Sequence, residues 1–195
     1  MSNLFATAYL PSIAYIAECL RSDNITIEAF ETYKKQTWRN HCHIYGPNGM
    51  QKLSVPVIRV NGNHTFTKDI RISYFQNWQN VHWRSIETAY NNSPFFLFYR
   101  DYLEPFYLKK FDFLLDFNTK LLEVLFLIFR VEKEIDFTDH FETQSIPQDH
   151  LVFPHYTQVF ENKFGFISAL SVVDLIFNLG PDALEYLSGS SFTTD

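Results

Sequence analysis

The sequence predicts an α/β or α+β fold in a single domain, residues 1–195, with an N-terminal mixed β-sheet, one early helix and a mostly helical C-terminal half. Short apolar or alternating runs between turn residues predominate as far as Ser73, and apolar residues repeat at helical spacing after it. With 46% hydrophobic and 18% aromatic residues among 195, the chain has enough apolar material for one core.

The N-terminal stretch predicts a strand that leads into a helix. Leu4–Leu10 is expected to be a buried strand that ends at Pro11, and Ser12 can cap the following helix. The apolar residues of this helix repeat at helical spacing: Ile13, Ile16, Ala17 and Leu20. Asn24–Ala29 then alternates apolar and polar residues, which is typical of a second, half-buried strand.

A hairpin is predicted over Tyr33–Val57, around the turn residues Gly46-Pro47-Asn48-Gly49. Alternation along its first strand, Asn40–Tyr45, separates two faces. One face carries His41, His43 and Tyr45, and the other carries Cys42 and Ile44. The partner strand Leu53–Val60 contains Pro56, which suits an edge or a bulge.

The remaining elements follow from turn residues and helical spacing. A turn at Val60–His64 precedes a strand at Lys68–Ser73, and Asn77 or Asn80 can cap a helix that runs to Tyr90. Further predicted segments are helices at Pro94–Tyr102 and Leu108–Arg130, a long loop at Val131–Phe153 with one short strand near Phe137, and a terminal helix. That last helix has Ser171 and Asp174 at capping-box spacing and Gly180-Pro181 at its end.

Charge and cysteine content exclude several classes of protein. A net charge of −6 argues against a broad phosphate-binding surface, so we expect no nucleic-acid partner. Cys19 and Cys42 are expected to be free thiols of a cytoplasmic protein. The N-terminus lacks the basic region of a signal peptide, and the apolar run Leu121–Phe129 is too short to span a membrane.

A basic, aromatic and amide-rich segment is the first candidate for a site. Lys34, Lys35 and Arg39 offer cations to a phosphate or carboxylate. Thr37, Trp38 and Asn40 lie among them. The alternative interpretation is a solvated strand edge with ordinary surface cations.

The histidines and the aromatic residues allow further interpretations. His41 and His43 have the spacing of two metal ligands on a strand, but two ligands make no site, so they are interpreted as half-exposed strand residues and no metal is expected. His82, near a helix start, is either a general base or a core-edge histidine. Cys42 is expected to be buried, and the aromatic run Phe95–Tyr107 is either core or the lining of a pocket.

Several unusual blocks in a fixed order resemble the bacterial WbqC-like family, and specifically its Bacteroides-type branch. The blocks are AYLPSIAYI, YKKQTWRNHCHI, LSVPV, IRIS, NWQNVHWRSIETAYNNSPFF, FLLDFN and GFISALSVVDLIFNLGP, and together they cover nearly the whole chain. This resemblance implies an α/β domain encoded with genes for surface polysaccharide biosynthesis.

The resemblance also implies which positions matter. The recurring positions of the family fall here on Tyr9, Leu10, Pro11, Lys35, Gln36, Thr37, Arg39, Asn40, Pro56, His82, Trp83, Tyr90, Ser93, Pro94, Asp174 and Asn178. Where relatives commonly read RNR, this chain has Arg39-Asn40-His41, so Lys35 or His41 must replace the second arginine if a doubly basic anion site is kept.

The resemblance implies a transferase that acts on a sugar or nucleotide-sugar intermediate, by acyl or aminoacyl transfer, in bacterial surface polysaccharide biosynthesis, and the candidate residues agree with an enzyme acting on an activated sugar. The predicted catalytic residues are His82, Tyr9 and Tyr90. The predicted substrate-binding residues are Lys35, Thr37, Trp38, Arg39, Asn40 and Ser93, and the expected partner is an anionic sugar or an activated acyl donor. No cofactor is expected, and the sequence leaves the oligomeric state open. The alternative is a non-catalytic protein that binds a glycan or a partner of the same gene cluster.

Overall fold

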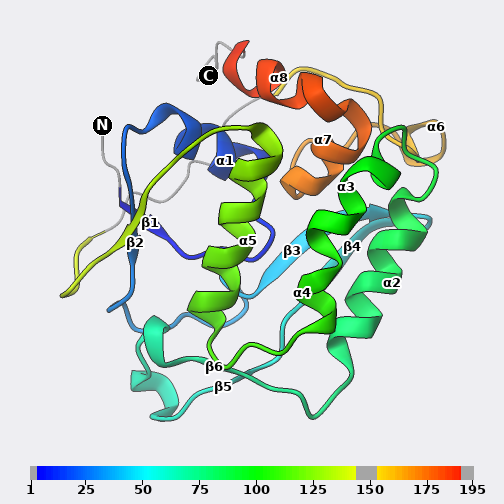
Figure 1. Cartoon of the computed structure of the whole chain (residues 1–195). Coiled ribbons are helices and arrows are strands. Elements are labelled where there is room, and N and C mark those ends of the chain that lie inside the picture. Colours follow the sequence, from blue (N-terminus) through cyan, green and yellow to red (C-terminus); the bar gives the residue numbers. More distant parts are fainter. Residues whose placement is uncertain (1–3, 144–152, 190–195) are drawn as a thin grey trace.

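The computed structural model describes residues 4–143 and 153–189, and it confirms the predicted α/β class (Figure 1). Three parallel strands form one sheet in the order β1-β2-β7: Leu4–Ala6, Ile25–Glu28 and Ile135–Phe137. Helix α1, Ile13–Arg21, connects β1 to β2, which is the connection that a parallel pair requires. The third strand arrives from the second half of the chain and pairs beside β2.

Four strands form two further small sheets, so the N-terminal strands divide among three sheets. Strands β3, His41–Gly46, and β4, Gly49–Ser54, make the predicted hairpin around Pro47-Asn48. Strands β5, Val57–Ile58, and β6, Arg71–Ile72, pair with each other. Pro56 separates β4 from β5 because proline has no N–H to donate to a ladder.

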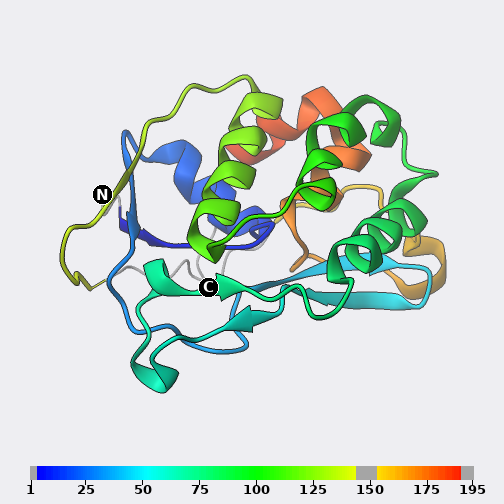
Figure 2. The same ribbon diagram turned by 60° about the horizontal axis from the view of Figure 1, so that its bottom comes forward.

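Most of the helices lie on one side of the strands, as Figure 2 shows. After α1 they are α2 at Trp78–Tyr90, α3 at Phe96–Leu103, α4 at Pro105–Leu108, α5 at Leu114–Phe129, α6 at Glu161–Phe164, α7 at Val172–Leu179 and α8 at Ala183–Gly189. Short 3₁₀ turns occur at Gly62–His64, Thr67–Asp69 and Gly180–Asp182. Among the described helices, none is long and apolar enough to cross a membrane.

The long predicted helix from Leu108 is shorter than expected because its first residues pair with a strand. Ile72 donates its N–H to the carbonyl of Asp112, and Leu114 donates to the carbonyl of Ile70. These bonds hold the chain extended beside β6, so α5 begins only at Leu114.

Aromatic side chains make up much of the core. Phe96, Phe106 and Tyr107 of the aromatic run are buried, whereas Phe98 and Tyr102 are exposed.

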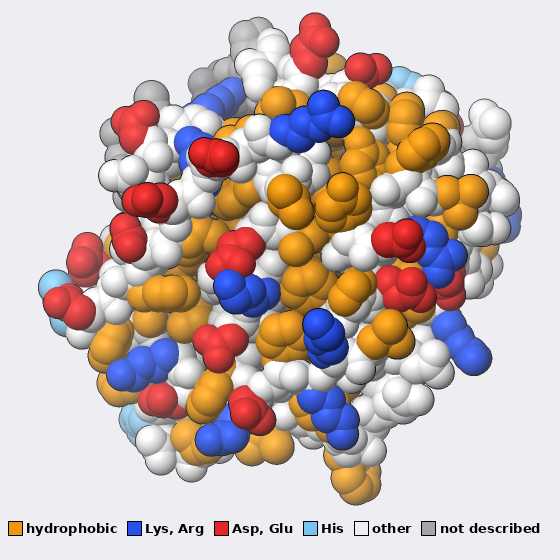
Figure 3. Space-filling view, viewed as in Figure 1, with side chains coloured by type: hydrophobic (Ala, Val, Ile, Leu, Met, Phe, Trp, Pro, Cys, Tyr) orange, Lys and Arg blue, Asp and Glu red, His pale blue; other side chains and the backbone are white. Residues whose placement is uncertain are grey.

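On the face seen in Figure 3, basic and acidic side chains lie interspersed among hydrophobic ones, and no extended basic area forms there.

Candidate functional site

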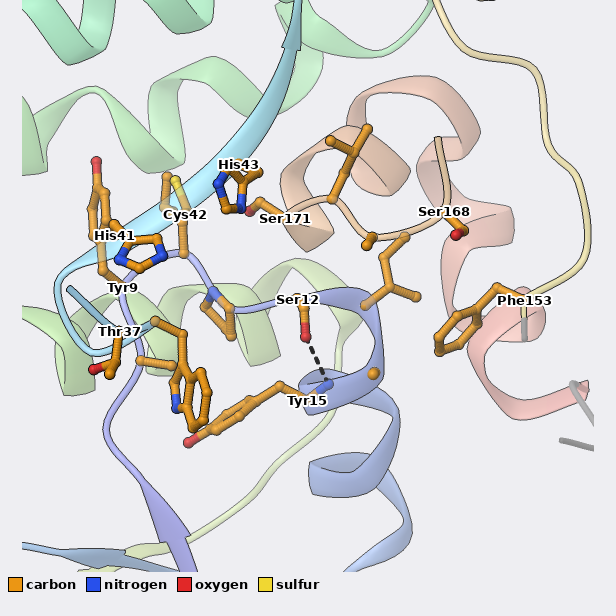
Figure 4. Close-up of a pocket in the computed structure, with 18 of the residues that line it drawn as sticks. Tyr9, Ser12, Tyr15, Thr37, His41, Cys42, His43, Phe153, Ser168 and Ser171 are labelled. Carbon is orange, nitrogen blue, oxygen red and sulfur yellow. Dashed lines mark hydrogen bonds between the residues drawn. The ribbon is translucent and has the colours of Figure 1, made fainter. Parts of the chain in front are cut away.

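A cavity of about 510 Å³ lies where the parallel sheet, the hairpin and two helix starts meet. Its wall combines the β1–α1 loop and first turn of α1 (8–15), the turn at 36–38, the strand residues 41–43, and Phe153 with Ser168–Ser171 (Figure 4). The cavity therefore lies beyond the carboxyl end of β1, where open α/β sheets commonly bind ligands.

Two residues of the wall have a positive φ, which residues other than glycine rarely adopt. Leu10 has φ 40° and Gln36 has φ 53°. Such conformations cost about 1–3 kcal/mol each and occur often at functional sites. Tyr9 donates its backbone N–H to the carbonyl of Trp38 at 2.9 Å, so the two loops hold each other.

Each of the two helices that start at the cavity is capped by a serine of the wall. Ser12 accepts a hydrogen bond from the N–H of Tyr15 at 3.3 Å, and Ser171 accepts one from the N–H of Val173 at 3.4 Å. Both caps confirm the predicted helix starts. The predicted capping box at α7 is wrong, because the N–H of Ser171 donates to the carbonyl of His43 and the Asp174 carboxylate accepts from Tyr156 and Gln158.

The starts of α1 and α7 are also bonded to each other. Ile13 donates its N–H to the carbonyl of Leu170 at 3.3 Å, and Val172 donates to the carbonyl of Pro11 at 2.8 Å. Two positive helix ends therefore lie head to head beside the cavity.

His41 and His43 lie on the cavity face of β3, as Figure 4 shows, while Cys42 between them is buried. The two imidazoles are 5.4 Å apart between ring centroids. Burial, followed by the charges of Lys52 and His43, lowers the pKa of His41 to about 4, and burial and Lys52 lower the pKa of His43. Both rings are neutral at pH 7. The described residues contain no cluster of three metal-binding side chains.

The structure brings His82 and Tyr9 together in a buried network. The Tyr9 hydroxyl is 2.9 Å from His82 Nδ1 and 2.9 Å from the hydroxyl of Tyr107. The tautomer of His82 decides which group donates in its bond with Tyr9, and the ring has a further hydrogen bond to the backbone of Ser54. Burial lowers the pKa of His82 to about 4 despite this bond. Tyr9 contributes to the cavity wall, but its hydroxyl is directed away from Ser12 and Ser171 (Figure 4), and His82 is not part of the wall.

Tyr90 and Ser93 form a separate pair in the core. The hydroxyl of Tyr90 accepts the N–H of Tyr45 at 3.1 Å, and the Ser93 hydroxyl donates to the carbonyl of Tyr90 at 2.7 Å. Neither residue contributes to the cavity wall. Tyr90 also bonds to the carboxylate of Asp174, which accepts from Tyr156 at 2.6 Å. These contacts give Tyr90 and Ser93 a structural role in the core.

The basic segment divides between the core, the cavity and the surface. Arg39 is 3% exposed, and its Nε and Nη2 donate to the two carboxylate oxygens of Glu31 at 2.5 and 2.7 Å. Lys35 is exposed, and Asn40 donates to the carbonyl of Val55 at 3.0 Å. Thr37 and Trp38 are the two predicted substrate-binding residues that lie on the cavity wall.

The prediction missed several residues of the wall. Ser12 and Ser171 appeared only as helix caps, and His43 appeared only in a weak metal pair. His41 appeared in that pair and as a possible replacement for a second arginine. The available signal for this place was the predicted strand Leu4–Leu10, which leads into a capped helix, because ligands commonly bind at such strand ends.

Comparisons with known proteins give the family. The family model described as the WbqC-like protein family matches residues 7–153, which include the loop after β1, the basic segment and the hairpin. The Mycobacterium tuberculosis protein named Uncharacterized protein Rv1507c is 25% identical over 219 aligned positions, which cover 92% of this chain and 91% of that protein. No solved structure matches the chain. The Bacteroides-type branch stays a prediction.

Proposed function

This chain belongs to the WbqC-like protein family, and from that premise we propose that it is a transferase whose cavity beside β3 holds a sugar. The group transferred is acyl or aminoacyl, and the process is bacterial surface polysaccharide biosynthesis in the cytoplasm. The observation that carries the proposal is the pair of neutral imidazoles on one wall of a 510 Å³ cavity formed from distant segments.

His43 is the general base in this proposal. A pKa of about 4 makes His41 a poor base at pH 7, so His41 serves to hold the acceptor by a hydrogen bond. His43 takes the proton of a sugar hydroxyl while that oxygen attacks the carbonyl carbon of the donor. A C–O bond forms, and the carbonyl electron pair moves to oxygen. When the carbonyl reforms, the bond to the leaving group breaks, and the leaving group takes the proton from His43.

The head-to-head starts of α1 and α7 favour the negative charge that develops on the carbonyl oxygen. Each helix start carries roughly half a positive charge, and the effect is strongest where water is excluded. Trp38 offers an aromatic surface for the sugar ring. In this arrangement His82 acts through Tyr9, whose hydroxyl it holds, and thereby steadies the loop that contains Leu10.

A product assay with matched histidine variants tests the proposal. Purified protein is incubated with sugars or nucleotide-sugars as acceptors and with acyl or aminoacyl thioesters and adenylates as donors, and products are detected by mass spectrometry. We expect His43→Gln to lower the rate by about 100-fold or more while the melting temperature stays near that of the wild type. His64→Gln, which changes an exposed histidine outside the cavity wall, should leave the rate unchanged. Equal rates for His43→Gln and the wild type would exclude His43 as the base.

One observation favours a second candidate, a non-catalytic glycan-binding protein. Among the residues that the structure describes, no Asp or Glu belongs to the cavity wall, so neither imidazole has a carboxylate there to orient it. A binding protein would return its glycan unaltered after prolonged incubation with every donor, whereas a transferase would convert it.

A further inference from the structure

The described part of the cavity wall lacks formal charge. No Lys, Arg, Asp or Glu belongs to it among residues 4–143 and 153–189, and burial keeps His41 and His43 neutral. A ligand group that enters this cavity therefore meets dipoles and aromatic surfaces, and no described residue of the wall carries an opposite charge to pair with it.

The nearest basic side chains are outside the wall. Arg39 reaches Thr37 with Nη1 at 3.3 Å, but Glu31 binds its Nε and Nη2 and neutralises it. Lys35 is exposed and directly precedes the wall residue Gln36 in the chain, and Lys52 is exposed on β4 opposite His43. A buried anion would have no cation of its own in the cavity.

Most of the backbone donors that usually bind phosphate at a helix start already have partners at α1 and α7. At α1, the N–H of Ile13 bonds to Leu170 and the N–H of Tyr15 bonds to its cap. At α7, the N–H of Val172 bonds to Pro11 and the N–H of Val173 bonds to its cap. These helix starts act on a ligand through their dipoles, without offering the set of free N–H groups that a phosphate site needs.

What the wall does offer is neutral and suited to hydroxyl groups. Hydroxyls come from Ser12, Thr37, Ser168 and Ser171, an amide from Gln36 and imidazoles from β3. The Thr37 hydroxyl already donates to the carbonyl of Lys34 and can only accept from a ligand. The other groups exchange hydrogen bonds with a group that both donates and accepts. Trp38 adds an aromatic surface for C–H groups.

We infer that the cavity takes an uncharged, polyhydroxylated ring and excludes carboxylate- and phosphate-bearing groups. The inference rests on the proposed function and names its substrate class as a neutral sugar, in place of the anionic sugar that the basic segment predicts. The phosphates of a nucleotide-sugar then lie outside the cavity, on the side of Lys35.

Matched pairs of sugars test this inference. Binding of methyl glucoside, methyl galactoside, methyl mannoside and methyl N-acetylglucosaminide is measured by saturation-transfer NMR and calorimetry. It is compared with binding of the corresponding uronic acid glycosides and 6-phosphates. We expect at least one neutral glycoside to bind and its charged counterparts to bind about tenfold or more weakly, because an unpaired charge would lose its hydration in the cavity.

A designed cation provides the converse test. Ser168 is exposed at the edge of the cavity, so Ser168→Lys places a positive charge there without filling the core. We expect this variant to bind the uronic acid glycoside more tightly than the wild type does. Thr88→Lys, an equal change of charge on the exposed face of α2 and outside the wall, should leave the preference unchanged.

Two results would overturn the inference: charged glycosides that bind as tightly as neutral ones, or no neutral glycoside bound by the wild type. Both are distinct from failure of the proposed function. Transfer to an acidic sugar would leave the transferase standing and remove the neutral substrate class. Selective binding of a neutral sugar with no product would keep the neutral ligand class and remove the transferase.

Discussion

Replacing Arg39 with methionine separates a structural role for this residue from a role in binding an anion. The change keeps an unbranched apolar side chain and removes the guanidinium, which donates two hydrogen bonds to Glu31. Glu31 is 4% exposed, and the Thr67 hydroxyl at 3.5 Å would be a weak remaining side-chain donor. The variant would therefore leave a nearly unpaired carboxylate in the core.

The expected loss of stability is large. Removing one partner of a buried ion pair destabilises a protein by about 3–5 kcal/mol, since the other charge stays buried. For a chain of 195 residues, each kcal/mol corresponds to about 2–4 °C in melting temperature, so a fall of about 6–20 °C is expected. The double variant Glu31→Gln, Arg39→Met removes the stranded charge and should recover at least half of the loss.

Urea denaturation of the four proteins of this cycle, followed by circular dichroism, gives the free energies. Lys35→Met, at an exposed position of the same segment, serves as the control and should change stability by less than about 0.5 kcal/mol. The structural role would be refuted if the free energy of unfolding of Arg39→Met lay within about 1 kcal/mol of the wild-type value. It would also be refuted if the variant bound ligand more weakly with no loss of stability.

Three further predictions concern pH, the C-terminal segment and a helix end. The pKa of about 4 for folded His82, against an ordinary value near 6.5, means that the unfolded chain binds more protons between these values. His82 alone should therefore lower stability by about 3 kcal/mol as pH drops through this window. His82→Gln should remove this contribution from the urea-derived curve and leave the contributions of His41 and His43. Asp174→Ala should lower the free energy of unfolding by about 2–4 kcal/mol and speed amide exchange in residues 153–167, because the carboxylate accepts hydrogen bonds from Tyr156 and Gln158 of that segment. Hydrogen exchange with mass spectrometry measures the exchange rates, and Asp174→Asn should restore part of the protection. Gly180→Ala should destabilise by at least about 2 kcal/mol more than Gly62→Ala in thermal denaturation, since both positions have φ near 58° but a methyl group at 180 would overlap the Phe95 ring.

Local patterns predicted those parts of the fold that depend on a few neighbouring residues. Alternation from Asn40 correctly placed Cys42 in the core and His43 on the opposite face. Ser12 and Ser171 cap helices as expected, because capping needs only the serine and the next three residues. These local rules do not say which elements meet, so they could not place the cavity.

The long-range pairings were beyond such reasoning. Strand β7 pairs with β2 across more than a hundred residues, and Ile13 bonds to Leu170 over a still greater separation. The basic segment shows the same difficulty for charge. Nothing in its composition marks Glu31 as a buried partner for Arg39, and without that partner the arginine is most simply interpreted as a ligand for an anion.

The backbone strain at the cavity strengthens its assignment as the functional site. Three described residues other than glycine have positive φ: Leu10, Gln36 and Arg130. Arg130 ends α5 in the left-handed conformation common at helix ends, so capping explains it. Leu10 ends no helix, has a branched side chain that is 0% exposed, and lies on the cavity wall next to Tyr9, whose hydroxyl is held by His82 and Tyr107. Since a strained conformation persists only where surrounding contacts enforce it, the buried network around His82 is the feature that keeps the loop, and with it the cavity, in shape.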